Sequence, residues 1–134
     1  MAVKYIVVEK GNPQRPEVAK KLYAQAKSTG EVTLKNLSKE IAEGSTTVSD
    51  TDVLAVLNDL TKTLIRHLSE GRIVRFGDFG SFQISLRSEG AEETKKFNSS
   101  LIKSGKITFR PGVDLKLMLN NLSYVKLEVK KTVD

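Results

Sequence analysis

The feature that most constrains the fold is a change of hydrophobic period at Gly71. Before this glycine, apolar residues recur at helical spacing: Val53, Leu57, Leu60, Leu64 and Leu68. After it, residues 82–87 alternate between apolar and polar side chains, as one half-buried antiparallel strand does. Helices followed by consecutive strands predict a fold of the α+β class.

Capping residues mark two helices before Gly71. Thr33 is suited to cap a first helix that runs to Gly44, and Ser49 with Asp52 forms a capping box before the second. Gly71 itself supplies the C-terminal cap of a helix of about twenty residues. The apolar face of this second helix is wide for so small a protein, which predicts burial against a helix of a second subunit and therefore a homodimer.

The sequence after Gly71 predicts a three-stranded antiparallel sheet. Its strands are residues 72–76, 79–87 and 106–110. The polar stretch 88–105 is too long for a tight turn, so it is either a protruding β-arm or a packed loop. Pro111 and Gly112 then introduce a short C-terminal helix.

The two ends of the chain add further elements. Residues 3–9 are β-branched and aromatic and predict a strand, and residues 124–129 predict another. Residues 17–28 favour a helix by propensity but a strand by alternation, and their composition leaves both readings open.

Composition argues against several classes of protein. Cysteine is absent and His67 is the sole histidine, so we expect no disulfides, no metal site within one chain and no cofactor. His67 is better explained as a helix-surface residue than as a catalytic one. Glu92 and Glu93 are adjacent to each other, but no nucleophile or base accompanies them. The protein is therefore not expected to be an enzyme. No apolar run approaches the ~20 residues that cross a bilayer, so a cytoplasmic protein without a membrane partner is expected.

The distribution of charge points to a polyanionic partner. The net charge is +6, and residues 72–134 hold twelve basic but only seven acidic residues. By strand alternation, Arg87, Lys106 and Arg110 lie on the outward face of the predicted sheet, with no acid among its strand positions.

Residues 31–122 resemble the bacterial histone-like HU/IHF proteins. Two blocks carry the resemblance: GRIVRFGDFGSF at residues 71–82 and FRPGVDLK at residues 109–116. The resemblance divides the chain into an N-terminal extension (1–30) that packs on the core, an HU-like domain (31–122), and a C-terminal strand and tail (123–134). It also favours a strand over residues 20–27.

The resemblance implies a function. Members of this family are intertwined homodimers whose sheets form a saddle with two β-arms, and they bind and bend duplex DNA from the minor groove with little sequence readout. A nucleoid-associated architectural protein of the cytoplasm, with no small-molecule substrate, is therefore expected. Arg87, Arg110 and Lys116 match basic positions of the family. The remaining candidates for phosphate contact are Lys106, Lys95, Lys96 and Lys103.

The sequence also departs from the family pattern. Ser85 stands where arginine is usual, Val113 where lysine is common, and the arm segment 87–100 has three glutamates and lacks the proline that wedges between base pairs. Phe97, Leu101 and Ile102 are possible wedges, although packing in a folded-back loop is favoured. The alternative function is an HU-fold dimer that serves as a protein-interaction or structural module and no longer bends DNA.

Overall fold

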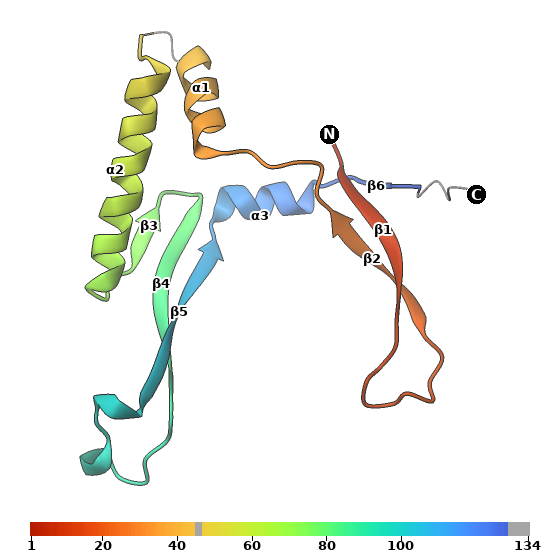
Figure 1. The fold of residues 1–134 in the computed structure, drawn as a ribbon, viewed down its shortest axis with the longest axis vertical. Helices are drawn as coiled ribbons and strands as arrows, with labels where there is room; N and C mark the ends of the chain where they lie inside the picture. Colours follow the sequence, from red (N-terminus) through yellow and green to blue (C-terminus); the bar gives the residue numbers. More distant parts are fainter. Residues whose placement is uncertain (45–46, 129–134) are drawn as a thin grey trace, which may run out of the picture. The chain divides into compact units, whose positions relative to one another are not determined.

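A computed structural model describes residues 1–44 and 47–128 and has a mixed α+β fold (Figure 1). It contains three α-helices and two separate three-stranded sheets. The chain divides into two compact units: residues 33–119 form one, and residues 1–32 together with the segment from Asn120 onward form the other. The α+β class is confirmed.

The larger unit begins with two helices that pack against each other, α1 (Leu34–Gly44) and α2 (Asp50–Ser69). At the start of α1, Thr33 and Asn36 each accept a hydrogen bond from the other's backbone N–H, both at 3.1 Å. At the start of α2, the Ser49 hydroxyl accepts from the Asp52 N–H at 3.1 Å. Side chains thus satisfy backbone donors that the helix itself leaves without partners.

Gly71 ends α2 in the left-handed conformation, with φ of +82°. The Gly71 N–H donates to the Leu68 carbonyl at 3.0 Å, and the Arg72 N–H donates to the His67 carbonyl at 3.1 Å. These two bonds form a Schellman motif, which stops the helix and turns the chain into the first strand of the sheet.

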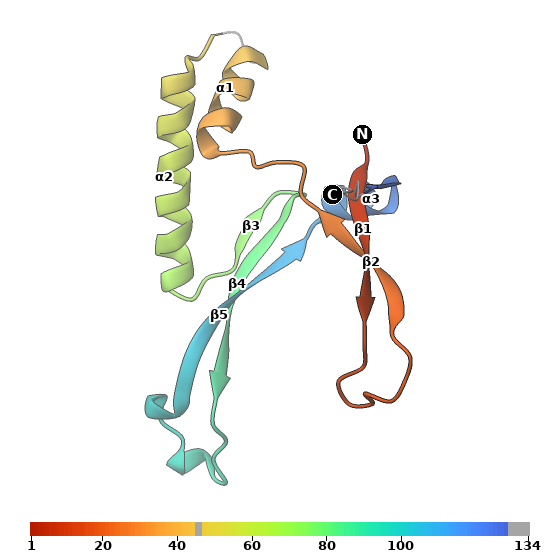
Figure 2. The same cartoon turned by 45° about the vertical axis from the view of Figure 1, so that its right-hand side comes forward.

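The sheet of this unit has the order β3-β4-β5 and is antiparallel throughout. Its strands are β3 (Val74–Phe76), β4 (Gly80–Ser88) and β5 (Ile102–Pro111). Strand β5 begins earlier than the expected residue 106, because its pairing with β4 continues to Ser88 and Ile102. Both views show β4 and β5 leaving the helices as a two-stranded ribbon (Figures 1 and 2).

Two short 3₁₀ turns close the end of this ribbon, η1 (Thr94–Lys96) and η2 (Ser99–Leu101). Phe97 is 42% exposed and Ile102 is 37% exposed, whereas Leu101 is half-buried. The favoured expectation that Phe97 and Ile102 pack in a folded-back loop is therefore not met within one chain, because the paired strands carry the segment away from the apolar groups of the helices.

The second unit is a sheet that joins the two ends of the chain, with the order β2-β1-β6. Strands β1 (Val3–Lys10) and β2 (Lys21–Lys27) form an antiparallel hairpin, and β6 (Tyr124–Lys126) pairs parallel to β1. The strand reading of residues 17–28 is thus the correct one. The expected C-terminal strand extends only to Lys126, and its last position, 129, lies outside the described residues. That the extension packs on the HU-like domain stays a prediction.

Within one chain this fold has almost no interior. Among the described residues only Ser38, Val53 and Gly80 are buried, and 25 large apolar side chains are exposed. The apolar side chains of α1, α2, α3 (Val113–Asn120) and the β3-β4-β5 sheet are therefore left without the cover that a stable fold requires.

Gly80 offers a direct test of how closely the strands approach. A Cβ at Gly80 would lie 2.6 Å from the Arg110 carbonyl oxygen and 2.6 Å from the Phe109 ring, whereas one at Gly105 would lie 3.7 Å from Ile84. We expect Gly80→Ala to lower the free energy of unfolding by about 1–3 kcal/mol and Gly105→Ala to change it by less than about 0.5 kcal/mol. Denaturant titrations at equal protein concentration measure both; equal midpoints would contradict the packing described.

Candidate functional site

The register of the β3-β4-β5 sheet places its basic side chains on one face. Residues directly opposite each other in antiparallel strands share a face. The pairs on the polar face are Arg75 with Ser81, Ser81 with Arg110, Gln83 with Thr108, Ser85 with Lys106, and Arg87 with Ser104. We call Arg75, Arg87, Lys106 and Arg110 the basic sheet face. No acidic residue occurs in these three strands.

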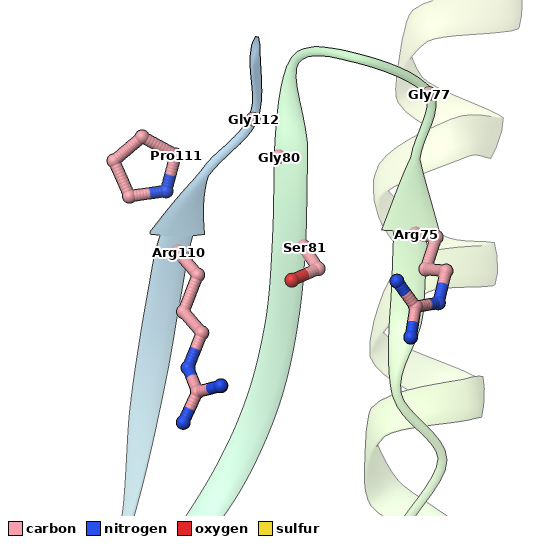
Figure 3. Close-up of a pocket in the computed structure, with 7 residues that line it drawn as sticks. All are labelled: Arg75, Gly77, Gly80, Ser81, Arg110, Pro111 and Gly112. Carbon is pink, nitrogen blue, oxygen red and sulfur yellow. The ribbon is translucent and has the colours of Figure 1, made fainter. Parts of the chain in front are cut away.

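Arg75 is the member of this face that the sequence analysis missed. It lies opposite Ser81, which in turn lies opposite Arg110, so the two arginines flank Ser81 from the neighbouring strands (Figure 3). Together with Pro111 and the glycines at the strand ends, they line a shallow hollow (Figure 3). The alternation of Val74, Arg75 and Phe76 was the available signal, because it turns Arg75 away from the two apolar residues.

Two of the predicted residues lie farther along the ribbon. Lys106 is exposed opposite Ser85, whose hydroxyl lies 3.2 Å from that of Thr108. Arg87 is six residues beyond Ser81 on the same strand, which separates it from the arginine pair by about 20 Å. The basic sheet face is thus a track along the ribbon rather than a compact patch.

The other predicted residues do not join this face. Lys103 lies at the irregularity between the pairs Arg87–Ser104 and Ser88–Ile102, outside the regular alternation that places Lys106 on the polar face. Its ammonium forms an ion pair with Glu89 at 2.9 Å. Lys95 and Lys96 lie in the 3₁₀ turn η1 at the end of the ribbon. Lys116 is exposed on α3.

The opposite face of the same sheet is apolar and carries a chain of aromatic rings. Phe76 and Phe79 are in edge contact at 5.8 Å between centroids, Phe79 is 5.8 Å from Phe109, and Phe109 is 4.9 Å from Phe82. Farther along the ribbon, Leu86 is 62% and Ile107 is 61% exposed. We call Phe76, Phe82, Ile84, Leu86, Ile107 and Phe109 the apolar sheet face. One sheet thus separates a charged surface from a surface that needs burial.

Other kinds of site find little support in the part of the chain that the structure describes. Residues 1–44 and 47–128 contain no group of three histidine, aspartate or glutamate side chains arranged to hold a metal ion. In the same residues, the helices are too short or too polar to span a bilayer.

Comparisons with known proteins agree with this architecture. Residues 1–126 match the family described as an HU domain fused to a winged helix-turn-helix, an Ig domain or a glycine-rich motif. No curated protein matches the chain.

Two solved structures resemble the fold. A proposed bacterial DNA-binding protein from Bacteroides vulgatus superposes with a TM-score of 0.67 at 11% identity over 98% of this chain. The present chain spans only 51% of that protein. HU from Anabaena, crystallised with DNA, superposes with a TM-score of 0.53 at 21% identity over 67% of this chain and 99% of its own.

Proposed function

Because the chain belongs to the HU-HIG family of HU-like DNA-binding proteins, we propose that it is an architectural protein that binds duplex DNA as a homodimer through its basic sheet face. The observation that carries the proposal is the division of the β3-β4-β5 sheet into a basic face without acids and an apolar face without cover. Anabaena HU, whose fold this chain shares, was crystallised with DNA.

The apolar surface of the larger unit supports the homodimer. Val56 and Ile65 on α2 are 65% and 66% exposed, and Leu117 on α3 is 56% exposed, in addition to the apolar sheet face. A second copy supplies the same apolar groups in symmetric positions, so each chain covers the other.

The dimer can be tested by mass. We expect light scattering at micromolar concentration to give about 30 kDa, twice the mass of one chain. Ile107→Glu places a carboxylate on the apolar sheet face and should abolish the dimer, since a buried charge without a partner is costly. Lys106→Glu changes the neighbouring residue on the other face and should leave the mass unchanged. A wild-type particle of one chain, or an Ile107→Glu protein that remains dimeric, would contradict the proposal.

On the basic sheet face, DNA binding would depend mainly on phosphate contacts. Arginine and lysine side chains that neutralise phosphates release condensed counterions, which gives affinity but little sequence preference. The strands fix the backbone that carries these side chains, so less backbone entropy is lost on binding than for residues in a loop. The best supported mode is therefore non-specific binding, and the proposed location is the nucleoid.

Salt dependence tests this mode of binding. We expect log K for a random duplex to fall linearly with log salt, with a slope of about −0.9 for each phosphate neutralised and several phosphates per dimer. Arg75→Ala with Arg110→Ala should weaken binding to all sequences and flatten the slope by about one for each phosphate that is no longer neutralised. Fluorescence anisotropy at four salt concentrations measures both quantities.

A matched variant tests whether the basic sheet face or the end of the β4-β5 ribbon contributes more to DNA affinity. Lys95→Ala with Lys96→Ala removes the same charge per chain, but Glu92 and Glu93 already offset these lysines, so the loss of affinity should be smaller. A larger loss for the lysine variant would assign binding to the end of the arm. If neither variant weakens binding, the proposal that the basic sheet face contacts DNA is wrong.

One observation favours the second candidate, a protein-interaction or structural module. The ribbon carries three glutamates, and one of them, Glu89, already pairs with Lys103. No proline is present in residues 87–100 to wedge between bases. A dimer that fails to bind duplex DNA at low salt would favour this second function.

A further inference from the structure

The β2-β1-β6 sheet has a second basic face, which lies outside the HU-like domain. Lys4 is directly opposite Lys27, and Lys10 is directly opposite Lys21. We call these four residues the lysine hairpin face. The same register places Ile6, Val8, Tyr23 and Gln25 between the two lysine pairs.

The two faces of this hairpin differ in character. The other face is largely apolar but also carries Lys126, which lies opposite Tyr5; its apolar residues are Val3, Tyr5, Val7, Leu22, Ala24, Ala26 and Tyr124. Glu9 is the one acidic residue in the three strands, and it lies opposite Leu22 on that apolar face. All four lysines of the lysine hairpin face are exposed, so they are accessible to a partner.

The lysine pairs are unfavourable for the hairpin taken alone. Like charges directly opposite each other in antiparallel strands destabilise the pairing. Across residues 1–44 and 47–128, the structure forms no ion pair to any of these four lysines. An anionic partner would remove the repulsion at both ends of the hairpin.

A hollow at one end of the hairpin adds independent support. It is lined by Lys10, Lys21 and Tyr23, together with Asn12 and two apolar residues of the connecting loop. Lysine and tyrosine side chains carry donors that are suited to a phosphate group.

We propose that the lysine hairpin face is a second contact surface for the phosphates of duplex DNA. This inference rests on the proposed function and extends it to the N-terminal extension. The two lysine pairs are six residues apart, about 20 Å along the strands, so they would contact phosphates about six base pairs apart along the duplex axis.

The test compares two variants of the full chain that lose equal charge. The first replaces Lys4, Lys10, Lys21 and Lys27 with glutamine. The control replaces Lys35, Lys39, Lys62 and Lys126 with glutamine; three of these lie on the helices and the fourth on the apolar face of the extension sheet. Anisotropy titrations with a labelled 30-base-pair duplex give the affinity and the salt slope of each. Phosphatidylserine vesicles serve as the competing polyanion.

We expect the hairpin variant to bind the duplex at least tenfold more weakly, with a salt slope smaller by about two to four, and the control to change less than half as much. Removal of the like-charge pairs should leave the melting temperature equal or higher, which excludes unfolding as the cause. A wild-type protein that does not bind the duplex would overturn both proposals. Wild-type binding with an unchanged slope in the hairpin variant, or a loss confined to vesicle binding, would overturn this one alone.

Discussion

The structure depends on the burial of one face of the β3-β4-β5 sheet. The rings of Phe82 and Phe109 pack across neighbouring strands. Phe79, in the turn before β4, contacts both Phe109 and Phe76 at the end of β3. Three of these four rings remain between 38% and 46% exposed in one chain. Since burial of apolar surface is the main favourable term in folding, the proposed dimer would add stability by covering these rings with a second copy of the chain.

The same constraint orients the charged side chains. Strand alternation means that any register burying the phenylalanines must turn Arg75, Lys106 and Arg110 to the opposite face. This register requires glycine at position 80, because the Arg110 carbonyl and the Phe109 ring occupy the space that a side chain would need. The apolar core and the basic sheet face are thus two consequences of one strand pairing.

Local sequence patterns predict the helix ends and part of the basic sheet face. Helix caps at Thr33, Ser49 and Gly71 depend on residues that are close in sequence, and the shared face of Lys106 and Arg110 follows from alternation within one strand. Arg75 was not predicted, because its strand has only three residues and so short an alternation is a weak signal of which face a side chain is on.

Other features depend on contacts between distant residues, which a pattern does not contain. Strand β6 pairs with β1 across about 120 residues of chain, and this pairing is absent from local propensity. The β2 segment has the alternation of a strand but the composition of a helix. It forms a strand because it pairs with β1, and this pairing outweighs its local helix propensity. Likewise, the ion pair between Lys103 and Glu89 depends on the bulge after Arg87, which the sequence does not reveal.

The central claim is that the protein binds DNA only as a dimer. In this dimer each chain covers the other's apolar sheet face, and the basic sheet faces contact the DNA. Native mass spectrometry of the protein with a 20-base-pair duplex tests it most directly, because it counts chains and duplexes in each complex. With the duplex in excess, the account predicts complexes of two chains with one duplex, and chains added in pairs as the protein concentration rises. A stable complex of one chain with one duplex would contradict it.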